Sequence, residues 1–285
     1  MKSNVSRYTN CDHEITLKQV QKLFLLNYSL LAAFFEKEGI KAFVIAGGVL
    51  GAVRHQGFIP WDDDIDFGLL REDYEKFIAL SKDLDPQVFF VENYRNSKHI
   101  DNGLTRIYFV GTFMPSSSSS NISKELYCDV FPLDFIPLSP KEQTKQSRQI
   151  LKYKKLLYLK TVSRGSTFLK TVYLWAAKIV LCFYSTKSIA QKMDFVASKK
   201  YTKINKDFVC SMMSQYSYKK QTMPTHFFQS GTRLRFENTY INVPNDYRDY
   251  LVRLYGPNFM TPVQRKGQSE SNKAFVNDSV FGLLK

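Results

Sequence analysis

Residues 46–67 read AGGVLGAVRHQGFIPWDDDIDF, which places a glycine pair after a short apolar run and a cluster of acids a dozen or so residues later. If the chain forms a β-strand over 64–67, side chains alternate between its faces, so Asp64 and Asp66 leave one face while Ile65 leaves the other. Two neighbouring carboxylates repel each other, and a divalent cation removes that conflict. Hard oxygen ligands suit Mg²⁺ or Mn²⁺. The sequence therefore predicts a metal site at these two acids.

Gly47 and Gly48 are predicted to form a turn that opens a helix. Glycine has no Cβ, so the backbone can approach a ligand closely, and a helix N-terminus aims free N–H groups at a phosphate. Such a turn can equally be structural. Arg54 and His55 follow and are candidates to bind phosphate oxygens, although either could be solvent exposed or pair with the acids of 62–66. A phosphate cradle beside metal-holding acids indicates phosphoryl or nucleotidyl transfer.

A third acid, Asp129, lies within LYCDVF at 126–131, which we expect to be a strand. A buried carboxylate without a partner is costly. The partner could be the metal ion held by Asp64 and Asp66, which we favour, or a nearby Arg or Lys. The role of Asp134 stays open, since it could cap a turn.

The stretch GVLGAVRHQGFIPWDDDID at 48–66 resembles the signature of the LicD family. That family belongs to the nucleotidyltransferase-fold superfamily and includes the fukutin-related proteins. Three further pieces are similar in the same order: REDYEKF at 71–77, CDVFPLD at 128–134, and VPNDYRDYL at 243–251 followed by LYG at 254–256. The resemblance spans roughly residues 15 to 265, with a weak middle.

The resemblance implies an α+β fold with a nucleotidyltransferase-like mixed β-sheet core flanked by helices. It implies metal-dependent transfer of phosphocholine from CDP-choline to a hydroxyl of a bacterial cell-surface glycan (teichoic acid, lipopolysaccharide or capsule). Asp129 would then serve as base or as a further metal ligand. Family members often carry Thr or Ser after the first glycine; this chain has Gly48, so a hydroxyl contact is missing. Glu237 and the pair Tyr247 and Tyr250 resemble the family's carboxy-terminal segment. Arg265 and Lys266 could reach an anionic group.

Three other functions compete with phosphocholine transfer. Another phospho-alcohol could be carried (phosphoribitol, phosphoglycerol or phosphoethanolamine), or the reaction could be nucleotidyl transfer. The chain could also be a non-enzymatic nucleic-acid-binding protein. The three intact acids and the absence of a nucleic-acid-binding signature argue against the last, so no nucleic-acid partner is expected.

The basic charge is concentrated in one region. The range Lys141 to Lys220 contains 18 Lys or Arg and 3 Asp or Glu, which is a net charge of +15. The net charge of the whole chain is +14, so this region accounts for all of it. Such a region indicates an anionic partner, either a membrane face or a lipid-linked glycan. We therefore expect a catalytic core at 1–140, a basic helical region at 141–225 that contacts acceptor or membrane, and a segment at 226–285 that packs back on the core.

The apolar stretch 167–186 lies inside this basic region. Lys170 and Lys178 interrupt it, so it is too short to span a membrane. It is either a buried core helix or an interfacial helix with snorkelling lysines.

Hydrophobic periodicity and turn residues predict the remaining elements. These are helices at 17–38 (Thr16 as N-cap, Gly39 as stop), 71–84 and 246–255, strands at 41–46, 87–92, 104–110, 125–131 and within 233–243, a loop at Ser116–Ser120, and a loose tail from about Gln268. The four cysteines show no zinc-ligand spacing. No apolar signal core is visible. We expect a cytoplasmic enzyme, where nucleotide-linked donors are found, with peripheral contact at the inner membrane face.

Overall fold

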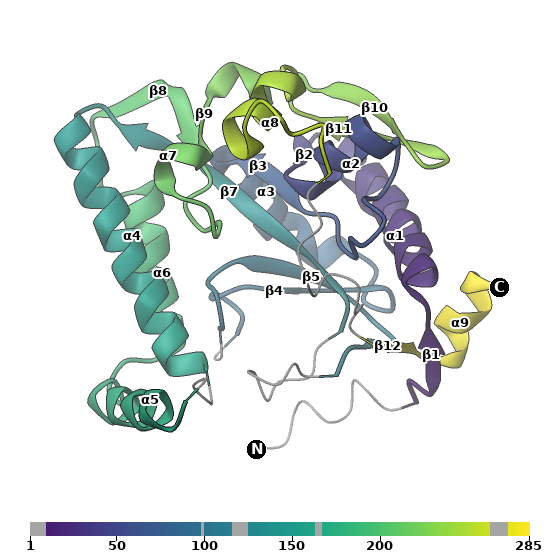
Figure 1. Ribbon diagram of the computed structural model, residues 1–285, viewed down its shortest axis with the longest axis horizontal. Coiled ribbons are helices and arrows are strands. Elements are labelled where there is room, and N and C mark those ends of the chain that lie inside the picture. The colour runs from purple at the N-terminus through teal and green to yellow at the C-terminus, as the bar shows by residue number, and fades with distance from the viewer. Residues whose placement is uncertain (1–9, 98–99, 116–124, 163–166, 263–272) are drawn as a thin grey trace.

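The computed structural model describes residues 10–97, 100–115, 125–162, 167–262 and 273–285 (Figure 1). The predicted loop at Ser116–Ser120 and the candidate residues Arg265 and Lys266 lie outside these ranges. The described chain combines helices with a mixed β-sheet, which confirms the predicted α+β class.

The central sheet contains one parallel strand pair, β3 with β7, among antiparallel ones. Its strands, in spatial order, are β2 (Ala42–Val44), β3 (Phe67–Leu70), β7 (Tyr127–Pro137), β5 (Thr105–Phe109) and β4 (Phe89–Glu92). Two more strands extend it, β8 (Ile204–Cys210) beside β7 and β9 (Thr222–Pro224) beside β8.

Strand β7 continues beyond the predicted end at 131. On one edge, β5 pairs with β7 up to Val130 and β8 pairs from Asp134 onward. Pro132 lies between these two partners. A proline has no N–H to donate, so it fits best where no strand pairs on that edge. Pro132 thus marks a change of partner within one continuous strand.

Helix α1 (Leu17–Lys37) follows the predicted bounds closely. Thr16 and Gln19 form a capping box at its start, and Gly39 adopts a φ of 58° just beyond its end. Its apolar face packs into the main core against the sheet (Figure 1). Helices α2 (Gly47–His55) and α3 (Arg71–Leu80) follow β2 and β3, and a 3-10 turn η1 (Ser81–Asp83) extends α3.

The basic region is helical only in part. It contains α4 (Pro140–Thr161), α5 (Phe168–Val180), α6 (Thr186–Ser198) and the short α7 (Tyr218–Gln221), but also strands β8 and β9. Helices α4 and α6 lie side by side and enclose a second apolar cluster around Leu157 and Met193 (Figure 1). The alternative that 167–186 forms a buried core helix is wrong, because the apolar side chains of α5 are largely exposed.

The C-terminal segment contributes small elements around the main sheet. They are η2 (Thr225–Phe228), the hairpin β10 (Thr232–Phe236) and β11 (Thr239–Val243), α8 (Tyr247–Tyr255), β12 (Ala274–Val276) and α9 (Asp278–Leu284). Strand β12 pairs with β1 (His13–Ile15) and β6 (Thr112–Phe113). The expected loose tail is therefore wrong for 273–285, since Ala274 and Val276 are buried in this three-stranded sheet. In the described residues, no helix is both long and apolar enough to cross a membrane.

Asp134, whose role the sequence left open, is part of a buried ion network. Arg71 Nε and Nη2 donate to its two carboxylate oxygens at 2.6 and 2.7 Å, and Arg71 Nη1 donates to Asp194 Oδ1 at 2.9 Å. The network joins α3 to β7 and α6. It is structural and lies apart from the cavity described below.

We expect Arg71→Met to lower the free energy of unfolding by about 3–5 kcal/mol, because Asp134 and Asp194 would stay buried without their cation. Urea denaturation would measure the loss. Lys37→Met is the matched control, since Lys37 pairs with Glu38 on the surface and an exposed pair contributes about 0–1 kcal/mol. Equal losses in the two variants would contradict this role of Arg71.

Candidate active site

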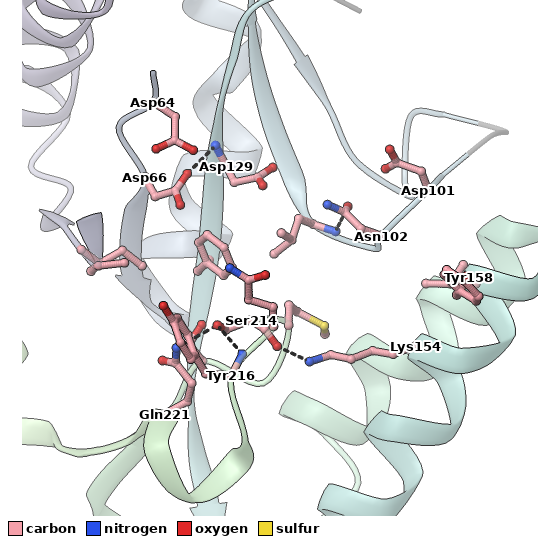
Figure 2. Close-up of a pocket in the computed structure, with 18 of the residues that line it drawn as sticks. Asp64, Asp66, Asp101, Asn102, Asp129, Lys154, Tyr158, Ser214, Tyr216 and Gln221 are labelled. Carbon is pink, nitrogen blue, oxygen red and sulfur yellow. Dashed lines mark hydrogen bonds between the residues drawn. The ribbon is translucent and has the colours of Figure 1, made fainter. Parts of the chain in front are cut away.

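A cavity of about 450 Å³ lies where the central sheet meets α4 (Figure 2). Its wall comes from residues far apart in the sequence: 45–46, Asp64 and Asp66, 101–104, Asp129 and Phe131, the C-terminal half of α4, parts of 211–221, and Tyr250. Figure 2 shows the three acids at one end of the cavity and Lys154 with Tyr158 on α4 across from them.

Asp64 and Asp66 precede strand β3 rather than lying within it. The strand begins at Phe67, but Ile45 N–H still donates to the Asp66 carbonyl at 3.0 Å and continues the pairing of β2 with β3. Ile65 is buried in the core, while both acids line the cavity. The predicted strand bound is wrong, and the predicted alternation of the side chains is confirmed.

Asp129 reaches the cavity from β7. The parallel register pairs Phe67 with Val130, and the Asp129 N–H donates to Asp66 Oδ1 at 3.3 Å. The opposite neighbour, β5, brings Arg106 beside it, and Arg106 Nε donates to Asp129 Oδ1 at 2.9 Å. The arginine partner that the sequence left as an alternative is thus present. Asp129 nevertheless lines the same cavity as the other two acids.

Burial and mutual repulsion disfavour the charged form of these acids. Desolvation, followed by repulsion from Asp62, Asp63 and Asp129, raises the pKa of Asp64 to about 8. Desolvation and the charges of Asp64 and Asp129 raise the pKa of Asp66 well above its ordinary value. The Asp64 residue is exposed to solvent although protein atoms crowd its carboxylate, so an ion can reach it.

The acids of the cavity fit a divalent cation that is bound by two carboxylates rather than by three. In the side-chain positions of the described residues, no three acidic, histidine or cysteine groups are placed to hold one ion together. Asp64 and Asp66, however, are two hard carboxylates at the cavity wall. Mg²⁺ is commonly bound by one or two carboxylates, with substrate phosphates and water completing its shell. The residues present fit an ion that these two acids hold with the substrate's help.

The glycine turn is built tightly against its surroundings. A Cβ on Gly47 would lie 2.7 Å from Asp62 Oδ2, and a Cβ on Gly48 would collide with the buried Val44 side chain. The Gly48 N–H donates to Ile45 O at 3.2 Å, so this helix-terminal N–H is already used. Neither glycine is part of the cavity wall, whereas Ala46 before them is. The alternative of a structural turn thus has direct support, and a phosphate role for the pair stays a prediction.

Ala46 carries the strain of this turn. Its φ is 49°, which an L-residue rarely adopts, and its N–H donates to the Tyr250 hydroxyl at 3.0 Å. The hydroxyl comes from α8 and ties the start of α2 to that helix. Tyr250 thus has a positioning role that the sequence did not reveal, because the two residues are 204 positions apart.

Arg54 and His55 lie at the opposite end of α2 from the glycines and outside the cavity wall. Arg54 Nη1 donates to Phe259 O at 3.1 Å. Desolvation raises the pKa of Asp62, and the Arg54 charge offsets a smaller part of that increase. Burial, followed by the Arg54 charge, lowers the pKa of His55. The structure does not bring these two residues together with Asp64 and Asp66.

Glu237 ties the β10–β11 turn to the loop before the acids. Its carboxylate accepts a hydrogen bond from Phe58 N–H at 3.1 Å, and its own N–H donates to Gln56 O at 2.7 Å. Glu237 therefore positions the segment that leads to Asp64 and does not itself line the cavity.

Sequence reasoning missed the far wall of the cavity. Lys154, Tyr158 and Thr161 recur at helical spacing on α4, on the side that also carries the buried Leu157. Desolvation lowers the pKa of Lys154 to about 8, and its ammonium donates to Ser214 O. The helical period alone could have assigned these residues to an inward face, but nothing in the sequence places that face opposite the acids.

Comparisons with known proteins found sequences to which this chain is similar. The family model described as LicD/FKTN/FKRP, nucleotidyltransferase domain, matches residues 39–160. The chain is 24% identical over 253 residues to the lipopolysaccharide cholinephosphotransferase LicD of Haemophilus influenzae, covering 87% of this chain and 93% of that protein. An uncharacterized protein of Rickettsia prowazekii is 57% identical over 37 residues, which is 13% of this chain and 14% of that protein. The matched residues 39–160 contain Asp64, Asp66 and Asp129, and the match agrees with the resemblance to the LicD family seen in the sequence.

Proposed function

We propose that this protein is a metal-dependent phosphotransferase that moves phosphocholine from CDP-choline to a hydroxyl of a bacterial cell-surface glycan. The phosphotransferase class is supported by the family match and by the similarity to a lipopolysaccharide cholinephosphotransferase over most of the chain. The observation that carries the proposal is the convergence of Asp64, Asp66 and Asp129 on one cavity.

Each wall of the cavity has a part in the proposed reaction. Asp64 and Asp66 would hold Mg²⁺ or Mn²⁺, which neutralises charge on the phosphoryl oxygens and on the leaving CMP. Asp129, which accepts a hydrogen bond from Arg106, would accept the proton of the attacking hydroxyl. Lys154 lines the cavity from α4, with its ammonium on Ser214 O, and would supply a cation for an anionic part of the substrate.

Ser211 offers a further contact for a ligand. Its hydroxyl is buried at the cavity wall and has no hydrogen-bond partner among the described residues. An unsatisfied buried hydroxyl costs free energy that a bound donor or acceptor group would recover.

The test is CMP release from a panel of CDP-linked donors, carrying choline, ethanolamine, glycerol or ribitol, with a cell-surface glycan and Mg²⁺. We expect CMP release to be fastest with CDP-choline and to require both the protein and the glycan. Faster release with another donor would reassign the alcohol and keep the enzyme class. If no donor released CMP while the protein bound DNA in a salt-dependent manner, the enzyme assignment would be overturned.

A further inference from the structure

Helix α5 presents an apolar surface that the described part of the chain leaves uncovered. We call it the α5 surface and define it by six exposed side chains: Leu169, Val172, Tyr173, Ile179, Val180 and Phe183. Leu169, Ile179 and Val180 are 74–79% exposed, and Phe183, just past the helix, is 93% exposed. Large apolar side chains gathered in this way mark an interaction site.

The exposed side chains share one side of the helix. Positions 169, 172, 173, 176, 179 and 180 recur at intervals of three and four, which places them along a single stripe. Leu174, on the opposite side, is only 4% exposed. The helix packs on the end of α4, and Lys160 of α4 donates to Leu181 O at 2.9 Å just beyond α5 (Figure 1). The orientation of the stripe toward solvent is thus fixed by contacts on the other side.

Lysines accompany this stripe rather than interrupt it. Lys170 and Lys178 each lie four residues from Leu174, on the side of α5 away from the stripe. Lys192 of α6 lies over the Tyr184 ring at 5.2 Å. The surrounding region, 141–220, has a net charge of +15. A second copy of this chain would bring the same positive charge to the interface, whereas an anionic bilayer would neutralise it. An apolar stripe with aromatic residues on one side of a helix and lysines on the other is the pattern of a helix that lies in the membrane interface.

We propose that α5 docks this protein on an anionic phospholipid bilayer, with the α5 surface inserted among the lipids and the lysines at the headgroups. Leu157, Tyr158 and Thr161 of α4 line the cavity within the last turns before α5. Docking through α5 would therefore hold the cavity close to the membrane plane, where a membrane-bound acceptor is presented. This docking is independent of the proposed reaction, because it depends only on the exposure of the α5 surface and on the positive charge of 141–220.

Sedimentation of the full chain with vesicles tests this docking. We expect binding to vesicles of mixed phosphatidylglycerol and phosphatidylcholine, and little binding to phosphatidylcholine alone. The triple variant Leu169→Glu, Ile179→Glu, Phe183→Glu should lower the bound fraction at least about tenfold, since three charges enter the apolar stripe. The matched control is Leu30→Glu, Tyr240→Glu, Leu283→Glu, which changes three side chains of 52–63% exposure on other elements and should bind like the parent.

Tryptophan fluorescence gives a second measurement. The chain has two tryptophans, and Trp175 is 63% exposed on α5. In a Trp61→Phe background, anionic vesicles should shift the Trp175 emission to shorter wavelength as the ring leaves water.

Three outcomes would overturn the docking proposal: unchanged sedimentation of the triple variant, equal binding to neutral vesicles, or a dimer formed through α5 without vesicle binding. The triple variant should keep the parent's CMP release with a water-soluble acceptor, so failure of the docking and failure of the proposed reaction can be told apart.

Discussion

Asp66→Asn should lower turnover of the nucleotide-linked donor by about 10²–10³-fold, the usual loss when one electrostatic stabiliser of a transition state is removed. The asparagine keeps an Oδ1 that can accept the Asp129 N–H, so the link between β7 and the acid segment survives. It loses the negative charge that would hold the cation. The change therefore separates charge from structure, and initial rates of CMP release at saturating donor would measure it.

Asp63→Asn is the matched control for this variant. Asp63 belongs to the same acid run but does not line the cavity. Its removal should change turnover by no more than a factor of a few. If Asp66→Asn retained near-parental turnover, or if both variants lost activity equally, the assignment of the catalytic ion to Asp64 and Asp66 would be wrong.

Removal of divalent ions should abolish turnover, and the metal-free protein should become less stable as pH rises from about 4 to about 8. The acids titrate near 4 in the unfolded chain, while the pKa of Asp64 is raised to about 8 and that of Asp66 is raised well above its ordinary value. Within this window the folded state holds protons that the unfolded state has released. The free energy of unfolding therefore falls as pH increases through it.

A bound cation takes the place of those protons. Added Mg²⁺ should raise Tm more at pH 8 than at pH 6, because protons compete for the carboxylates at the lower pH. At an ion concentration of about 100 times Kd the stabilisation is about 2.7 kcal/mol. Thermal unfolding with chelator, Mg²⁺ or Mn²⁺ measures both effects.

The control for the ion's location is Asp66→Asn. This variant should be more stable than the parent in chelator and should gain much less from Mg²⁺. An undiminished gain in Tm would show that the ion binds elsewhere on the chain.

Local patterns predicted much of the framework correctly. Thr16 and Gly39 mark both ends of α1, and the alternation of Asp64, Ile65 and Asp66 sends the acids one way and the aliphatic side chain into the core. These features depend on neighbours in the chain, so residue type and spacing determine them.

The predictions that were wrong depend on contacts between segments that are far apart in the sequence. Strand β7 passes Pro132 because its partner changes from β5 to β8, and the tail at 273–285 is ordered because β1 and β6 pair with β12. Arg54 and His55 are close to the glycines in sequence, yet α2 holds them at its other end. In each case the deciding contact comes from a distant segment.

By itself, the sequence determined the resemblance to the LicD family that the match over 39–160 supports, the acids proposed for the site and the basic character of 141–220. Only the tertiary structure decided that Arg106 holds Asp129, that Arg71 neutralises Asp134, that Lys154 lines the same cavity as the acids and that the apolar side of α5 stays in solvent. The physical reason is that a side chain's role depends on which partner neutralises or covers it. Those partners are brought together by strand register and helix packing across tens to hundreds of residues, which local spacing does not encode.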